Sequence, residues 1–303
     1  MSADAPDSTP PDARRSENAR RGISADTIRV MVRVVLFAFA GWSVWRLMPF
    51  VMPPAAGGLV VAALSTFAAG ALANGLLARM YERSQLSAFG MAWGKPSARE
   101  LLIGIAGGAG AAAAIFLVAL ATRQAVVERV PAPNTWPVDL VFILIVLAFG
   151  AAGEEMLFRG YAFQLLVRTM GEFAAVLPVA ALFGLAHMGN QDVTALAIVN
   201  TIAWGVLLGY AFLLTRSLWL SIGLHFGWNG AMPLLGVNLS GFTMGVPGYS
   251  LRWSAGDLWS GGRYGLEGSV MTSAVVVILF FVLRRAVARP DLRRDVEADE
   301  PGM

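Results

Sequence analysis

Eight apolar stretches divide the chain, and no other feature restricts its possible folds as strongly. Several approach the roughly 20 residues that a helix needs to cross the hydrocarbon layer of a membrane. Because every backbone N–H and C=O group inside lipid must be paired within the protein, spanning segments form helices or closed barrels. The stretches predict an all-α fold: a polytopic membrane bundle of about eight transmembrane helices with a buried polar cavity. They are Val30 to Leu47, Gly57 to Ala78, Leu101 to Ala121, Val138 to Ala152, Phe173 to His187, Val193 to Thr215, Leu218 to Leu235 and Gly268 to Leu283.

Composition supports this prediction and excludes several kinds of site. The chain is 56% hydrophobic and 14% charged, whereas charged residues make up about a quarter of a typical soluble domain. It contains no cysteine, which excludes disulfides, thiol nucleophiles and thiolate metal sites. The net charge of +3 comes from basic residues that flank the apolar stretches. This arrangement indicates membrane topology, so we expect a lipid bilayer and no nucleic acid among the partners.

The basic residues also predict topology and domain limits. With eight spans both chain ends lie on one side, and most basic residues fall there, which predicts cytoplasmic N and C termini. Arg33 within the first stretch and Pro178 within the fifth leave a seven-span alternative open. We predict a disordered cytoplasmic tail at 1–27, an integral membrane domain at 28–285 with its motif core at 140–235, and a charged cytoplasmic tail at 286–303.

Ionisable side chains inside apolar stretches are rare and usually functional, and here they are concentrated in the second half of the chain. The only two histidines, His187 and His225, lie in such stretches, and a third stretch ends with Glu154, Glu155 and Arg159. On a helix, Glu155 and Arg159 are four residues apart and can pair. Glu154 is rotated by about 100° from Glu155, so it is free to face elsewhere.

Helix geometry places these groups at similar depth. His225 and Asn229 are four residues apart and share a helix face. If the helix that carries Glu154 continues to about Met170, Glu154, His187 and Asn229 lie roughly 18–24 Å from the same end of the bundle, and His225 roughly 12 Å. We therefore expect these four side chains to line one buried site.

The four residues permit peptide-bond hydrolysis. Glu154 in a desolvated pocket can take a proton from water, and His187 can share that task or orient the water. His225 and Asn229 can donate hydrogen bonds to the oxyanion that develops on a scissile carbonyl. No GxSxG or HExxH pattern occurs, so the sequence indicates neither a serine hydrolase elbow nor that zinc motif.

A zinc site is the alternative use of the same residues. Glu154, His187 and His225, with Asn229, offer mixed nitrogen and oxygen ligands for Zn²⁺ and a bound water. Because Asn is a poor zinc ligand, we expect a glutamate mechanism that requires no cofactor. A transporter or proton relay is a further alternative, although the first half shows no matching repeat. A non-catalytic membrane scaffold or immunity protein would keep the same residues for packing.

Three further features have simpler interpretations. Gly104 and Gly108 form a GxxxG pattern, which predicts close helix packing. Asn74 and Asn200 lie alone in their stretches and are interpreted as packing contacts. The Gly-rich segment from Gly236 to Glu267 contains two tryptophans, which predict either interfacial anchors or a mobile cover over a site.

The ordered motifs resemble the CAAX prenyl protease and bacteriocin-processing family, also called CPBP or Abi. The resemblance rests on Glu154-Glu155-x-x-x-Arg159, Phe183-x-x-x-His187 and His225-x-x-x-Asn229, which follow one another in successive apolar stretches. It implies an eight-helix intramembrane endopeptidase in which Glu154 and His187 activate water and His225 and Asn229 hold the oxyanion. Glu155 and Arg159 would form the supporting pair. Some members are described as metalloproteases, which keeps the zinc alternative open.

The resemblance also suggests a class of substrate. Eukaryotic members of the family cut prenylated CAAX tails. The excess of arginine over lysine and the richness in alanine are typical of a GC-rich bacterium, where that substrate is absent. We therefore expect a protein of the bacterial cytoplasmic membrane that cleaves a membrane-associated peptide or protein, including lipidated ones. Bacteriocin processing and self-immunity are candidate roles.

Overall fold

The computed structural model describes residues 25–131, 133–244, 246 and 248–287. Within them, each of the eight apolar stretches forms an α-helix. These helices are α2 (Ala25–Val51), α3 (Gly58–Leu77), α4 (Lys95–Ala121), α5 (Trp136–Arg159), α7 (Glu172–Ala186), α8 (Ala195–Thr215), α9 (Leu218–Leu234) and α11 (Val270–Val287). The shorter α6 (Tyr161–Met170) and α10 (Asp257–Ser260) complete the α-helices of the described residues.

The fold class is confirmed as an all-α membrane bundle. By length and composition, five helical segments of the described chain can cross a membrane: Asp26–Val51, Gly58–Glu82, Lys95–Ala121, Trp136–Met170 and Ala195–Thr215. Helix α7 is apolar as well but has only 15 residues. The count of eight spans and the cytoplasmic placement of both ends stay predictions. Of the predicted tails, residues 1–24 and 288–303 lie outside the described residues. Residues 25–27 are instead the first turn of α2, and residues 286 and 287 are the end of α11.

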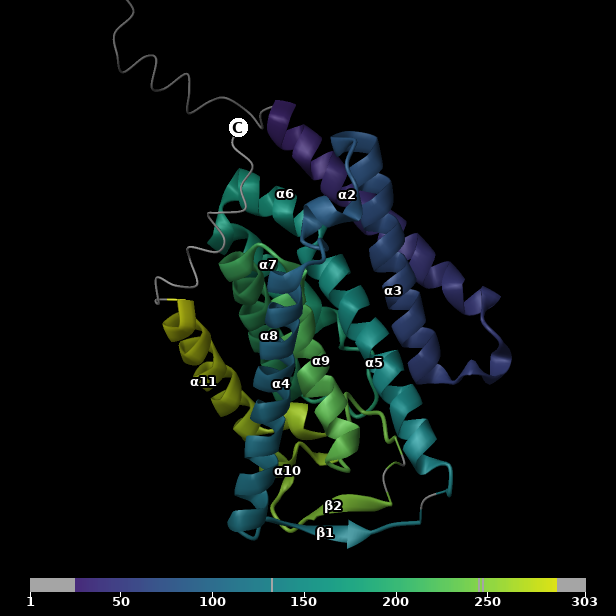
Figure 1. Cartoon of the computed structure of the whole chain (residues 1–303), viewed down its shortest axis with the longest axis vertical. Helices are drawn as coiled ribbons and strands as arrows, with labels where there is room; N and C mark the ends of the chain where they lie inside the picture. Colours follow the sequence, from purple (N-terminus) through teal and green to yellow (C-terminus); the bar gives the residue numbers. More distant parts are fainter. Residues whose placement is uncertain (1–24, 132, 245, 247, 288–303) are drawn as a thin grey trace, which may run out of the picture.

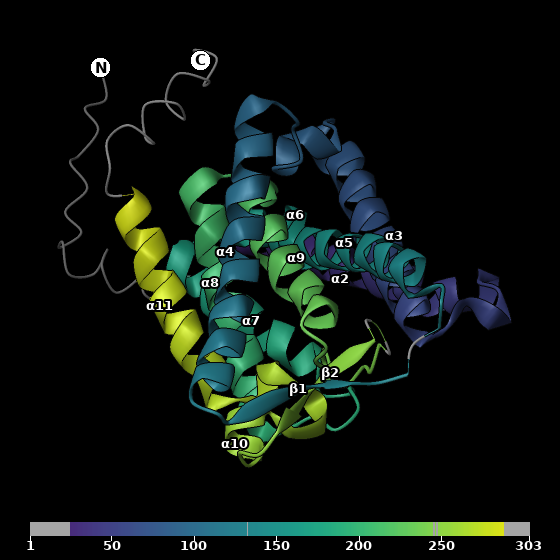
Figure 2. The ribbon, with the colours of Figure 1, turned by 60° about the horizontal axis from the view of Figure 1, so that its bottom comes forward.

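The helices form two groups (Figures 1 and 2), and residues of both groups line a cavity. Helix α4 packs along α9, α7 packs along α8, and α11 covers the outer side of α8. On the other side, α3 packs on α5, and α2 packs on α3 and α6. The start of α2 and the end of α11 lie at the same end of the bundle as α6, and the two strands lie at the opposite end (Figure 1).

A small β-ribbon closes that opposite end, which the sequence analysis did not predict. Strand β1 (Ala125–Arg129) pairs antiparallel with β2 (Tyr249–Trp253), with Val127 opposite Leu251. The buried side chains of Ala125 and Leu251 pack on Ala119 near the end of α4. Strand β2 and α10 both belong to the Gly236 to Glu267 segment. The described part of this segment therefore folds as a structured cap between α9 and α11.

The α4 and α9 helices approach closely because both present glycines at the crossing. A Cβ atom at Gly104 would lie 2.5 Å from the Leu220 carbonyl oxygen, and one at Gly108 would overlap that of Leu224. Gly227 on α9 is equally restricted by the backbone of Ile105. The GxxxG pattern thus packs helices within the chain, as predicted.

This crossing gives a direct stability prediction. Gly108→Ala is expected to lower the free energy of unfolding by about 1–3 kcal/mol, because the new methyl group forces the two helix backbones apart. Gly110→Ala on the same helix is the matched control, since nothing lies within 4 Å of a Cβ atom at Gly110. Thermal unfolding of both variants in one detergent measures the difference. Equal stability of the two variants would contradict close packing at this crossing.

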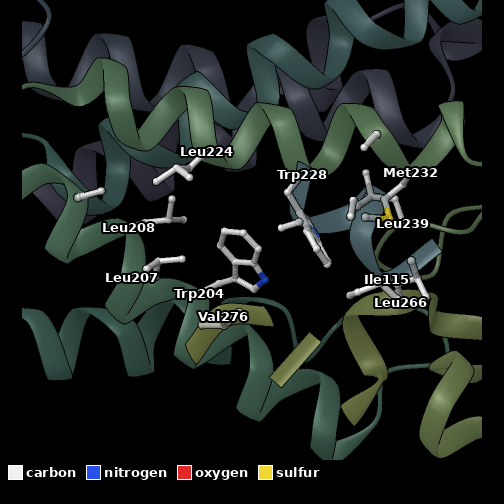
Figure 3. Close-up of a cluster of buried hydrophobic side chains, with 14 of the residues drawn as sticks. Ile115, Trp204, Leu207, Leu208, Leu224, Trp228, Met232, Leu239, Leu266 and Val276 are labelled. Atoms are coloured by element: carbon white, nitrogen blue, oxygen red, sulfur yellow. The ribbon is translucent and has the colours of Figure 1, made fainter. Parts of the chain in front are cut away.

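The largest buried cluster lies between α8 and α9 and beneath the cap. Figure 3 shows Trp204 of α8 beside Trp228 of α9, with Leu208 and Leu224 on one side and Leu239 of the cap on the other. The two indole rings have centroids 5.0 Å apart. The cap is therefore packed into the same core that holds these two helices together.

Helix α5 ends at Arg159, which corrects the expectation of one continuous helix to Met170. The backbone at Gly160 has φ −77° and ψ −143°, so α6 starts afresh at Tyr161. Asn74 of α3 stabilises this break: its Nδ2 donates to the Met156 carbonyl at 2.8 Å, and its Oδ1 accepts from the Tyr161 amide at 2.7 Å. A Cβ atom at Gly160 would overlap Oδ1 of Asn74. Asn74 is therefore more than a packing contact, because it pairs the backbone groups that the break leaves free.

Candidate active site

The two adjacent glutamates of α5 face different surroundings, as their helical spacing predicts. The Glu155 side chain is 0% exposed, whereas the Glu154 side chain is 26% exposed and lines a cavity. The Oε2 atom of Glu154 is itself buried and accepts no hydrogen bond from any described residue. Glu155 is thus committed to contacts within the protein, and Glu154 is available to a molecule in the cavity.

Glu155 joins an arginine and a histidine in a buried network. Arg159 Nη1 donates to Glu155 Oε1 at 3.2 Å, and Nδ1 of His225 lies 2.9 Å from the same oxygen. Arg159 Nη2 donates to the Gly205 carbonyl of α8 at 2.9 Å. The predicted pair of Glu155 and Arg159 is present, and it holds three helices together while it fixes the His225 ring.

The two imidazoles approach the free glutamate from different helices. His187, directly after α7, lies with Nδ1 2.7 Å from the Phe183 carbonyl. A carbonyl only accepts, so Nδ1 carries the hydrogen and a neutral His187 has a lone pair on Nε2. Nε2 of His187 and Nε2 of His225 each lie 3.8 Å from Glu154 Oε2. One carboxylate oxygen therefore faces both imidazoles.

Phe183 packs against these groups. Its ring lies 4.9 Å from the His187 ring and 6.0 Å from the His225 ring, measured between centroids. The Arg159 guanidinium lies 4.7 Å from the Phe183 ring centroid, a distance at which a cation and an aromatic face attract. The motif that pairs Phe183 with His187 thus does more than place the histidine, because its aromatic ring packs against both imidazoles and the arginine.

All four predicted site residues line one cavity of about 630 Å³. Asn229 lies one helical turn beyond His225 on α9 and is partly buried. Glu154 comes from the last turns of α5 and His187 from the end of α7. All four side chains line this cavity although α5 ends at Arg159, because α5, α7 and α9 all contribute to its lining.

The cavity has an apolar side and a polar end. Its apolar side includes residues of α2, α3, α6 and α7, among them Phe37, Trp42, Trp45, Leu166 and Leu182. Trp42 and Leu182 are each 58% exposed, so this side opens at the surface of the bundle. The polar end continues past Asn229 to Ser240 and Glu267 of the cap. Among the described residues, the lining includes two glutamates and no lysine or arginine.

Glu267 is a cavity residue that the sequence analysis missed. Its Oε2 accepts hydrogen bonds from the Ser240 amide at 2.6 Å and the Ser240 hydroxyl at 2.8 Å. Burial raises the pKa of Glu267, while the Ser240 hydrogen bonds and the nearby His187 imidazole oppose the shift. Its position directly before an apolar stretch was the signal available in the sequence.

Asn200 fixes the segment that carries Glu267. Its Nδ2 donates to the carbonyl oxygens of Glu267 and Ser269, each at 2.8 Å, and its Oδ1 accepts from Ser273 at 2.6 Å. Asn200 was expected to be a packing contact only. Instead, it connects α8 to the junction between the cap and α11, and so holds Glu267 at the cavity.

The arrangement of donors does not form a metal-binding cluster. Within the described part of the chain, no group of three or more histidine, aspartate or glutamate side chains is placed to hold a metal ion. The two Nε2 atoms lie 3.8 Å from the Glu154 carboxylate.

The site lies within a segment that matches a known family. Residues 135–231 match the family model described as Type II CAAX prenyl endopeptidase Rce1-like. The matched segment runs from the residue before α5 to α9 and contains all three motifs. A comparison with curated proteins gave no match. The family match confirms the resemblance that the motifs indicated: from residue 135 to residue 231, this integral membrane protein carries the signature of the Rce1-like type II CAAX prenyl endopeptidases.

Proposed function

We propose that the protein is an intramembrane endopeptidase that hydrolyses a peptide bond of a membrane-associated peptide or protein. One observation carries the proposal: Glu154 Oε2 lies 3.8 Å from Nε2 of both His187 and His225, inside a cavity that Asn229 also lines. A polar separation of this length suits a bridging water better than a direct hydrogen bond. A carboxylate, two imidazoles and an amide around one water are the groups that hydrolysis of an amide requires.

In the proposed reaction, Glu154 is the general base. It takes a proton from water as the water oxygen attacks the scissile carbonyl carbon, and Nε2 of His187 accepts a hydrogen bond that orients the water. The tetrahedral intermediate then collapses, the C–N bond breaks, and the proton held by Glu154 passes to the leaving amine. The products are one carboxylate and one amine, and Glu154 returns to its starting state.

His225 and Asn229 would stabilise the oxyanion of the intermediate. The Nδ1 hydrogen of His225 is committed to Glu155, so donation from Nε2 requires the imidazolium form. The negative charges of Glu154 and Glu155 offset the positive charges of that imidazolium and of Arg159, so these four groups together carry no net charge. The amide of Asn229, one turn away, supplies the second donor.

The shape of the cavity supports a substrate that arrives from the membrane. Its apolar side is open at the surface beside Trp42 and Leu182, and such a surface favours apolar chains over water. An apolar segment or a lipid chain of the substrate would lie against α2 and α3, with the adjoining peptide at Glu154. We extend the proposal to lipidated substrates on this basis, and to a bacterial cytoplasmic membrane on the composition of the chain.

Cleavage in ¹⁸O water tests the proposed reaction. Purified protein in lipid nanodiscs is incubated with a library of lipid-anchored peptides, and the products are read by mass spectrometry. We expect new amine and carboxylate ends, with one ¹⁸O atom in each new carboxylate, because water supplies that oxygen. A library that stays intact under all lipid compositions would favour the scaffold alternative.

Removal of metals tests the absence of a cofactor requirement. We expect cleavage to persist after dialysis against a chelator, and elemental analysis of the active protein to find less than one zinc per chain. Loss of activity on chelation, with recovery on addition of zinc alone, would instead establish the zinc alternative.

A further inference from the structure

Two tryptophans that line the cavity have buried indole N–H groups without a partner in the described chain. The indole Nε1 atoms of Trp204 and Trp228 make no hydrogen bond with any described residue. The residues are 6% and 2% exposed, and both line the cavity that contains the catalytic groups. An unpaired buried donor costs about 1–3 kcal/mol, and such groups are rare in native structures. Two of them side by side (Figure 3) indicate a ligand that brings its own acceptors.

A carboxylate lines the same cavity. Both hydrogen bonds that Glu267 accepts go to Oε2, from Ser240, and its side chain lines the cavity. In the part of the chain that the structure describes, no lysine or arginine lines the cavity with it. Arg159, the buried cation of the site, is engaged by Glu155 and the Gly205 carbonyl. Among the described lining residues, the imidazoles of His187 and His225 are thus the groups that can offset the charge of Glu267, and no lysine or arginine pairs with it.

The position of this carboxylate is fixed by contacts on both sides. The Ser240 amide donates to Oε2 of Glu267, and Nδ2 of Asn200 donates to the Glu267 backbone carbonyl oxygen. The Thr272 hydroxyl donates to the carbonyl oxygen of the preceding residue, Leu266, at 2.6 Å. The neighbouring Tyr264 is 0% exposed, and burial together with the charge of Glu267 raises the pKa of Tyr264 to about 12. The Tyr264 hydroxyl thus stays protonated and neutral at physiological pH, and it adds no negative charge beside Glu267.

We propose that Glu267, Trp204 and Trp228 form a substrate subsite that binds a residue with a cationic side chain next to the scissile bond. The carboxylate of Glu267 pairs with the lysine or arginine, and the two indole N–H groups donate to carbonyl oxygens of the peptide. The subsite rests on the proposed endopeptidase function and adds the class of substrate. The favoured substrate has an apolar or lipid-bearing segment on the α2 and α3 side and a basic residue on the cap side.

The cationic preference is tested with matched peptides. Each lipid-anchored peptide carries lysine, or its neutral counterpart norleucine, at one position on either side of the bond that is cut. We expect wild type to prefer lysine at one position, and Glu267→Gln to reduce the lysine-over-norleucine ratio of kcat/KM by about 10- to 100-fold, the range for a hydrogen bond to a charged group. Glu267→Asp, which keeps the charge, should retain part of the ratio.

A matched control distinguishes loss of the carboxylate in the cavity from loss of a carboxylate elsewhere in the protein. Glu128 lies on β1, pairs with Arg252 and does not line the cavity. Glu128→Gln should therefore leave the lysine-over-norleucine ratio at the wild-type value. An unchanged ratio in Glu267→Gln, or a wild type with no preference at any position, would overturn the cationic subsite.

Binding to an inactive variant distinguishes failure of the subsite from failure of the proposed function. The same peptides are titrated into Glu154→Gln and into Glu154→Gln with Glu267→Gln, with no need for turnover. Tighter binding of lysine peptides that depends on Glu267 would support the subsite even if no peptide is cleaved. Equal binding of both peptide types by both proteins would reject the subsite, whether or not the wild type is a protease.

The indole donors are tested without a substitution at either tryptophan. In protein labelled with ¹⁵N-tryptophan, we expect the indole N–H resonances of Trp204 and Trp228 to move downfield when a lysine peptide binds to Glu154→Gln. The resonance of Trp93, which is 63% exposed and does not line the cavity, serves as the control. Unchanged Trp204 and Trp228 resonances at saturating peptide would show that these groups do not contact the peptide.

Discussion

Replacement of Glu154 by glutamine is expected to abolish peptide hydrolysis and leave the bundle folded. Glutamine keeps the shape of the side chain but cannot take a proton from water. General base catalysis contributes about 10²- to 10⁴-fold to a rate, and we expect a loss in kcat of at least that size. Stability should change little, because Glu154 is 26% exposed and its Oε2 accepts no hydrogen bond from a described residue. Rates of ¹⁸O incorporation and thermal unfolding measure the two effects.

Glu100→Gln is the matched control for this substitution. Glu100 lies on α4, is partly buried, has an Oε2 atom that likewise lacks a hydrogen-bond partner among the described residues, and does not line the cavity. Its replacement should leave kcat near the wild-type value. If Glu154→Gln cleaved substrate as fast as Glu100→Gln and wild type, Glu154 could not be the base, and the proposed reaction would fail.

The parts of the site that depend on local geometry could be predicted from the sequence. Helical spacing alone separates Glu154 from Glu155 and pairs Glu155 with Arg159, and the structure contains both features. The apolar stretches likewise predict the eight longer helices, because a run of apolar residues in lipid has few alternatives to a helix. These inferences depend on contacts within four residues, where the geometry of one helix decides the outcome.

The missed features depend on partners that are distant in the sequence. The break at Gly160 is held by Asn74, and the Tyr161 amide and its acceptor are 87 residues apart. Asn200 reaches the Glu267 carbonyl across 67 residues. Nothing in the pattern around either asparagine specifies its partner. Both were interpreted as packing contacts because an isolated amide in an apolar helix commonly bonds across to a neighbour, and the identity of that neighbour is a property of the tertiary fold.

Loss of the Arg159 side chain is expected to cause the largest loss of stability in the bundle. Arg159 and Glu155 are 1% and 0% exposed, and removal of one partner of a buried ion pair typically costs about 3–5 kcal/mol because the other charge is left uncompensated. Arg159→Ala also removes the hydrogen bond to Gly205 and the contact with Phe183. Thermal unfolding should show the loss of stability. The rate of cleavage should fall as well, because Glu155 would then contact His225 without the hydrogen bond from Arg159 that fixes its carboxylate.

Two matched variants distinguish the stability lost through an uncompensated buried charge from the stability lost when any arginine side chain is removed. Arg216→Ala breaks an ion pair with Glu172 in which the side chains are 54% and 52% exposed, and such exposed pairs contribute only about 0–1 kcal/mol. Glu155→Gln combined with Arg159→Met removes both buried charges at once, and it should recover much of the stability that Arg159→Ala loses. The amide oxygen that Glu155→Gln introduces would still accept from Nδ1 of His225, so the ring would keep its orientation. If the double variant were as unstable as Arg159→Ala, the cost would come from lost packing at Phe183 and Gly205, and the uncompensated carboxylate would not be its cause.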